Sequence, residues 1–97
     1  MNVKKLKIAR NKIDQIDNNI FNLIKKRTKI VKYMLNLKEY KNQIVDQKRI
    51  KIILKKVKVK SIKNRIDPRI TNRIWKSMIW AYVKYQRKNF NQSKTRS

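Results

Sequence analysis

The stretch from Leu6 to Glu39, LKIARNKIDQIDNNIFNLIKKRTKIVKYMLNLKE, decides the fold of this chain. It contains neither Pro nor Gly, the residues that most often interrupt a helix. Its apolar residues recur at helical spacing, and they are Leu6, Ala9, Ile13, Ile16, Ile20, Leu23, Ile24, Ile30, Val31, Met34 and Leu35. The pattern predicts one amphipathic helix about 50 Å long, because each helical residue adds about 1.5 Å.

Three cations, Arg10, Arg27 and Lys38, lie along or beside this apolar stripe. Helix geometry turns them toward the same side as the apolar residues. A buried cation is costly unless it is paired, and the stretch offers few carboxylates to pair it. We therefore predict that an anionic ligand from outside the chain completes this site.

Composition narrows the possible functions. A length of 97 residues suits one domain with a modest core, and the sequence contains neither a membrane-spanning apolar run nor a secretory signal pattern. The absence of Cys fits the reducing cytoplasm, where we expect the protein. Without His or Cys, no Ser-His or Cys-His nucleophile can form. The five carboxylates are scattered, so we predict neither a metal site nor a cofactor.

The net charge of +24 has two interpretations. Such a balance is typical of proteins that meet nucleic acid, an anionic membrane surface or acidic ligands. Lys, Ile and Asn are also the amino acids of A/T-rich codons, so genome composition can supply many of these lysines. A basic run could track phosphates, and it consists of Lys48, Arg49, Lys51, Lys55, Lys56, Lys58, Lys60, Lys63 and Arg65. Nucleic-acid binding is therefore the alternative outside the enzyme class.

The rest of the chain predicts two shorter helices. Met1 to Lys5 is polar and expected to fray, and the first helix should end near residues 40–43. Asp46 is a plausible N-cap for a second helix reaching Ile62. Its alternating Val57 and Val59 could also form a strand, but a lone strand would have no partner.

A third helix is predicted from Asp67 and Pro68, a typical cap and first helical residue, to Phe90. Its inward residues should be Ile70, Ile74, Met78, Ala81, Tyr82 and Tyr85. We expect residues 1–90 to form the helical domain and residues 91–97 a disordered basic tail. The first helix is much longer than the other two, so part of its apolar stripe would remain exposed to water in a monomer. A homodimer that packs the long helices together is therefore predicted.

The polar residues along the three predicted helices resemble, in kind and spacing, those of the all-helical chorismate mutase family. The resemblance rests on Arg10-x-x-Ile13-Asp14-x-Ile16-Asp17, then Arg27, Lys38, Asp46-x-x-Arg49 and Gln86. It covers roughly residues 6–90 and implies the type II fold: an intertwined helical homodimer with active sites built from both chains and no cofactor. The substrate implied is a small dianion, chorismate or isochorismate.

The resemblance also implies a role for each residue. Arg27 and the partner chain's copy of Arg10 would bind the two carboxylates, since a guanidinium meets a carboxylate with two hydrogen bonds. Lys38 and Gln86 would donate to the ether oxygen of the breaking C–O bond. Arg49 would lie near a carboxylate or order a lid, with Asp46 close by. For Asp46, a purely capping role is the preferred interpretation.

Two departures from the mutase pattern indicate which reaction is catalysed. Where the mutases commonly have Glu and Ser, this chain has Ile50 and Tyr82. Both departures resemble the isochorismate pyruvate lyase branch, and the chain also lacks the extra loop residue of some mutases. An apolar wall discriminates between substrates by only about 1–3 kcal/mol, so we expect residual mutase activity. The sequence favours the lyase that forms salicylate, with chorismate mutase, which forms prephenate for aromatic amino-acid biosynthesis, as the alternative.

Overall fold

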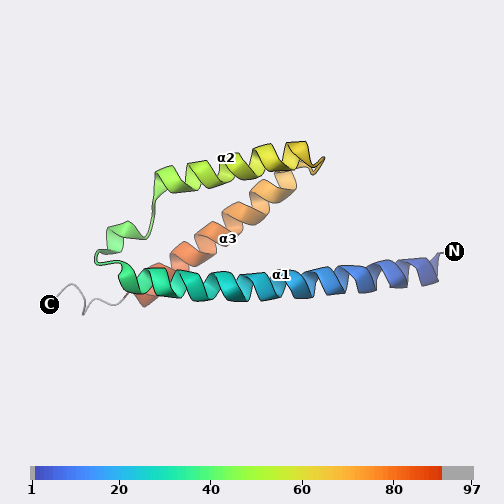
Figure 1. Cartoon of the computed structure of the whole chain (residues 1–97), viewed down its shortest axis with the longest axis horizontal. Helices are drawn as coiled ribbons and strands as arrows, with labels where there is room; N and C mark the ends of the chain where they lie inside the picture. Colours follow the sequence, from blue (N-terminus) through green and yellow to red (C-terminus); the bar gives the residue numbers. More distant parts are fainter. Residues whose placement is uncertain (1, 91–97) are drawn as a thin grey trace. The chain divides into compact units, whose positions relative to one another are not determined.

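The computed structural model describes residues 2–90, and its regular structure over that range is helical (Figure 1). In chain order the elements are α1 (Val3–Leu37), the 3₁₀ turn η1 (Lys41–Gln43), α2 (Gln47–Lys63) and α3 (Pro68–Asn89). This confirms the predicted all-α chain with three helices and a long first helix. The predicted tail, residues 91–97, lies outside the described residues. The chain divides into two compact units, one ending at Tyr33 and one beginning at Met34.

Helix α1 is shifted toward the N-terminus relative to its prediction. It begins at Val3 rather than after Lys5, because the Leu6 N–H already donates to the Asn2 carbonyl at 2.9 Å. It ends at Leu37, short of residues 40–43. There the Lys38 N–H donates to the Leu35 carbonyl at 3.2 Å, a 3₁₀-type bond that tightens the last turn.

In the first unit, the apolar stripe of α1 is open to solvent. Every residue from 2 to 26 is exposed. Along the stripe, Ile13, Ile16 and Ile20 keep 55%, 52% and 47% of their surface accessible. A row of apolar side chains this exposed is unusual on a soluble monomer.

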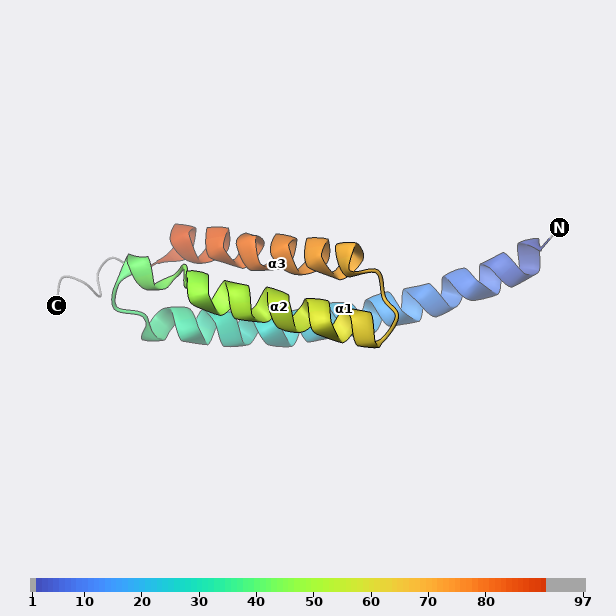
Figure 2. The ribbon, with the colours of Figure 1, turned by 90° about the horizontal axis from the view of Figure 1, so that it is seen from above.

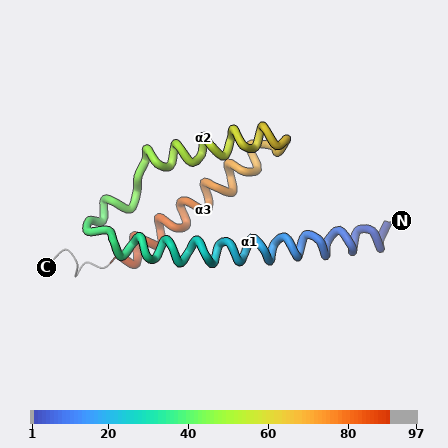
Figure 3. Tube along the Cα trace, in the orientation of Figure 1, coloured from blue at the N-terminus to red at the C-terminus, as the bar shows by residue number. Residues whose placement is uncertain are grey.

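In the second unit, α2 and α3 form a helical hairpin (Figures 2 and 3). Both predicted N-caps are confirmed. The Asp46 carboxylate accepts from the Arg49 N–H at 3.0 Å, and the Asp67 carboxylate accepts from the Arg69 N–H at 2.9 Å. Val57 and Val59 are helical, so the strand alternative was wrong.

The turn between α2 and α3 places Arg65 in the left-handed region, with φ of 56°. This conformation crowds Cβ against the following carbonyl in an L-residue. Gly, which lacks Cβ and would avoid this crowding, is absent from the sequence.

The core of this unit joins the end of α1, the connection and the hairpin. Its buried residues are Leu35, Ile44, Ile50, Ile79 and Val83. At the closed end of the hairpin, the hydroxyls of Ser61 and Thr71 are hydrogen-bonded at 2.6 Å, which links α2 to α3. No helix within residues 2–90 is both long and apolar enough to cross a bilayer.

The predicted inward face of α3 needs a correction. Met78, Tyr82 and Tyr85 are half-buried, but Ala81 is exposed, and Ile70 and Ile74 keep 57% and 53% of their surface accessible. The core is built on the adjoining line of Ile79 and Val83. Because α3 has apolar residues on both lines, periodicity alone could not decide which one packs against α2.

Candidate active site

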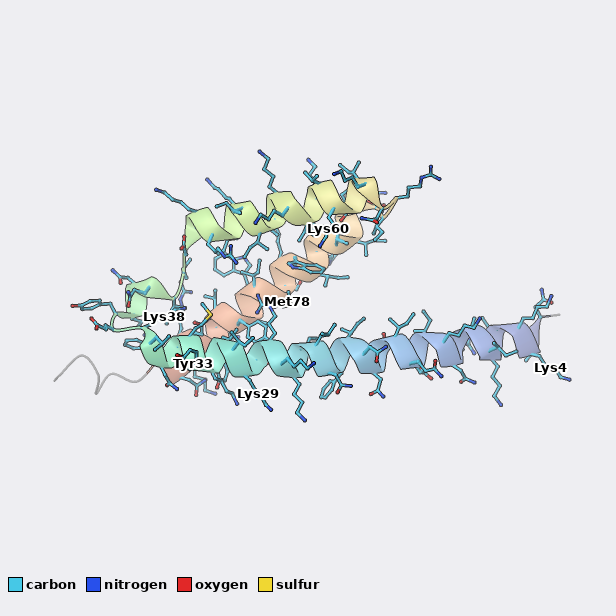
Figure 4. The ribbon with its side chains drawn as sticks, viewed as in Figure 1. Lys4, Lys29, Tyr33, Lys38, Lys60 and Met78 are labelled. Carbon is cyan, nitrogen blue, oxygen red and sulfur yellow. The ribbon has the colours of Figure 1, made fainter. Side chains whose placement is uncertain are left out.

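Lys38 and Gln86 meet in the structure although 48 residues separate them. Lys38 directly follows the last residue of α1, and Gln86 lies in the last turns of α3. The Lys38 Nζ donates a hydrogen bond to the Gln86 Oε1 at 2.7 Å. The end of α1 and the end of α3 therefore supply the two groups for which the family resemblance implies a catalytic role. Figure 4 shows the position of Lys38 beyond the end of α1.

The surroundings of this pair hold both groups in place. Gln86 is buried, with 7% of its surface accessible, and it follows the core residue Val83 by one turn of α3. Lys38 is half-buried, and burial lowers the pKa of its ammonium group below the ordinary value of 10.5. A short charge-assisted hydrogen bond offsets part of that desolvation.

The direction of the hydrogen bond determines what the pair can do. Because Oε1 accepts from Lys38, this bond uses neither the Gln86 NH₂ group nor two of the three Lys38 N–H groups, all of which are donors. Fixed donors aimed at one point stabilise negative charge that develops on an oxygen, and they require little reorganisation to do so. The arrangement is suited to a reaction that needs electrostatic stabilisation without a nucleophile.

The connection after Lys38 is held by hydrogen bonds to Gln43 and forms a shallow hollow. The Gln43 Oε1 accepts from the backbone N–H groups of Glu39 and Tyr40, at 2.8 and 2.9 Å. The hollow is lined by Lys38, Asn42, Gln43, Val45, Asp46, Gln47 and Lys48. Among these, Asn42, Gln43, Val45, Gln47 and Lys48 were not predicted as site residues, and only their closeness to Lys38 in the sequence could have indicated them.

The predicted residues of α2 are placed in different ways. Asp46 lines the hollow but also caps α2, as preferred from the sequence. Arg49 is exposed and does not line the hollow. Ile50 is buried in the core with 9% of its surface accessible, so this position presents no hydrogen-bonding side chain. On α3, Tyr82 is half-buried one turn before Gln86.

Arg10 and Arg27 belong to the other compact unit, which ends at Tyr33. Both lie on α1, where Arg10 is exposed and Arg27 is half-buried. Their predicted convergence with Lys38 and Gln86 remains a prediction.

The described chain is thus all-α, with a long first helix, a helical hairpin and a lysine–glutamine hydrogen bond that joins the end of α1 to the end of α3. The family model of chorismate mutase type II matches residues 9–87, which is most of the chain. The protein therefore belongs to the chorismate mutase type II family, a family of enzymes. No curated protein and no solved structure matches the chain.

Proposed function

We propose that this protein breaks the ether C–O bond of a chorismate-type dianion, and that its main reaction is the elimination of pyruvate from isochorismate to give salicylate. The observation that carries this proposal is the 2.7 Å contact between Lys38 and Gln86. As the C–O bond breaks, negative charge develops on the ether oxygen. The remaining N–H donors of the two side chains can stabilise that charge together.

The preference for isochorismate rests on Ile50. In chorismate the ring hydroxyl is at C4, and a carboxylate at position 50 could accept a hydrogen bond from it. Ile50 offers no acceptor and lies in the apolar core. Isochorismate has its hydroxyl at C2, so the absence of an acceptor near C4 costs it less.

Chorismate mutase activity is the second candidate, and the family match favours it. The same donors would stabilise the same oxygen during the rearrangement of chorismate to prephenate. The experiment that separates the two supplies chorismate and isochorismate in parallel and measures prephenate and salicylate. Salicylate from isochorismate at the higher kcat/KM supports the lyase. Abundant prephenate without salicylate would establish the mutase instead.

We also propose that the active protein is a homodimer and that Arg10 of each chain serves the partner's site, with Arg27 binding the other carboxylate. The exposed apolar stripe of α1 supports this proposal, because pairing would remove it from water. Arg10 lies beside that stripe, so a second copy packed there would bring its Arg10 to the same surface. Arg49 is proposed to bind a carboxylate once substrate is present.

The dimer is tested by placing a charge on the stripe. Ile13→Glu should give a monomer with greatly reduced activity, since a carboxylate would be buried twice in a symmetric interface. Ile8→Glu is the matched control. Ile8 is 56% exposed against 55% for Ile13, but it lies five residues away and therefore on a different face of the helix. Sedimentation equilibrium measures the mass. A wild-type protein that is monomeric and fully active would refute the shared site.

A further inference from the structure

The solvent face of α2 carries a cationic surface, most of which the proposed reaction does not use. Lys48, which lines the hollow, and Arg49, which is proposed to bind a carboxylate, are its two members at the candidate site. Between Gln47 and Lys63 there are eight cations and no carboxylate. They are Lys48, Arg49, Lys51, Lys55, Lys56, Lys58, Lys60 and Lys63, all of them exposed. The ion pair between Arg69 and Asp67 lies outside this helix. Figure 4 shows side chains that end in nitrogen projecting from α2 on the side away from α3.

Exposed aliphatic side chains lie inside this cationic surface. Ile52 and Val59 each keep 49% of their surface accessible, and Ile62 keeps 59%. These residues are not part of the hairpin core, which uses Ile50 on the other side of α2. Ile52 and Val59 are seven residues apart, so they lie two turns apart on nearly the same line of the helix.

The neighbours of these aliphatic residues are almost all cations. On a helix surface, the nearest neighbours of a residue are those three and four positions away. For Ile52 all four such positions are Lys or Arg, namely Lys48, Arg49, Lys55 and Lys56. For Val59, three of the four are Lys and the fourth is Ile62. The face is thus an aliphatic ridge with lysine rows on both sides.

We propose that this face of α2, the Ile52–Val59 ridge with its flanking cations, docks on the surface of an anionic lipid bilayer. A helix of this kind lies in the interface, with its aliphatic residues among the headgroups and its cations on the lipid phosphates. Lysine suits the flanks, because its long stem can stay beside the aliphatic residues while its ammonium group reaches the phosphate layer.

The composition of this face also argues against two other partners, nucleic acid and a second copy of the same face. Nucleic-acid bases are read by hydrogen-bonding groups or aromatic rings, and Ile52 and Val59 supply neither. A second copy of the same face would bring like charges together, which is unfavourable. A bilayer offers both phosphates for the lysines and an apolar zone for the ridge.

The first test measures binding of the full-length protein to vesicles. The wild-type protein should bind equimolar phosphatidylcholine–phosphatidylglycerol vesicles and not phosphatidylcholine alone. The double variant Ile52→Gln/Val59→Gln keeps every cation and should bind about tenfold more weakly, since two aliphatic side chains no longer leave water. The control Ile70→Gln/Ile74→Gln removes two isoleucines from α3 that are slightly more exposed than Ile52 and Val59, and it should bind as the wild type does. Equal affinity of the wild type and the α2 variant would overturn the proposal.

The second test does not depend on the stability of the double variant. The chain has no Cys, so Val59→Cys carries one polarity-sensitive fluorophore, and Ile74→Cys carries the same label on α3. Anionic vesicles should shift the emission of the label at residue 59 to the blue and leave the label at residue 74 unchanged. A label at residue 59 that stays in water while the protein sediments with vesicles would overturn the proposal. The proposal would also be overturned if the protein bound duplex DNA more tightly than anionic vesicles and the Ile52→Gln/Val59→Gln variant bound that DNA equally well, because charge alone would then explain the surface.

Discussion

Replacing Gln86 with Leu tests whether the contact between Lys38 and Gln86 serves catalysis or only packing. Leu has a similar size and is apolar, so it can remain beside Val83 in the core. The change removes a hydrogen bond of 2.7 Å to a charged group, and such bonds contribute about 1.5–3 kcal/mol. Lys38 is only half-buried, so water can replace part of this contact. We therefore expect the free energy of unfolding to fall by about 1 kcal/mol.

The expected loss of activity is much larger. If Gln86 donates to the oxygen of the breaking bond, its removal should lower kcat by about 10²–10³-fold, or about 2.7–4 kcal/mol, as for one donor of an oxyanion hole. Catalysis and stability would thus be affected to clearly different extents. A purely structural role would lower activity only as far as the folded fraction falls.

A double-mutant cycle makes this test sharper. Lys38→Ala should abolish most of the activity, and adding Gln86→Leu should then cost little more, because both groups act on the same oxygen. Initial rates with isochorismate and with chorismate measure catalysis, and urea unfolding followed by circular dichroism measures stability. Lys84→Ala, at an exposed position on the same helix, should change neither. A loss of kcat smaller than about tenfold for Gln86→Leu would refute the role of Gln86 as a donor to the breaking bond, given the effect expected of a lost donor.

Three further outcomes are expected. The alkaline loss of kcat/KM should begin below pH 10.5, because burial lowers the pKa of Lys38 and only the protonated ammonium stabilises the anion. The alkaline loss of kcat should occur at higher pH, because the bound dianion favours the protonated form of Lys38. Rate profiles across alkaline pH measure both. Arg65→Gly should raise the free energy of unfolding by about 1 kcal/mol, since Gly adopts φ of 56° without the Cβ clash, and urea unfolding measures it. Asp46→Ala should lower the free energy of unfolding by about 1 kcal/mol by removing the cap on the Arg49 N–H, and the same assay would contradict this if stability were unchanged.

The positions of the helices followed from local chemistry in the sequence. Asp46 and Asp67 were recognised as N-caps, and Pro68 as a first helical residue, because these signals act within one turn. The absence of Pro and Gly predicted that α1 would continue unbroken. The ends of α1 were predicted less accurately. Backbone hydrogen bonds at Leu6 and Lys38 extend or tighten its terminal turns without any side-chain signal in the sequence.

The sequence by itself thus determined an all-α chain and its caps, while the family resemblance named the residues of the candidate site. Only the tertiary structure decided that Ile79 and Val83, rather than Ile70 and Ile74, enter the core, because periodicity defines a helix face but not the neighbour that covers it. It also decided that the Lys38 ammonium meets the Gln86 amide across 48 residues. That contact depends on where the end of α1 and the end of α3 are held by the packing of the hairpin, and no local pattern encodes this distance.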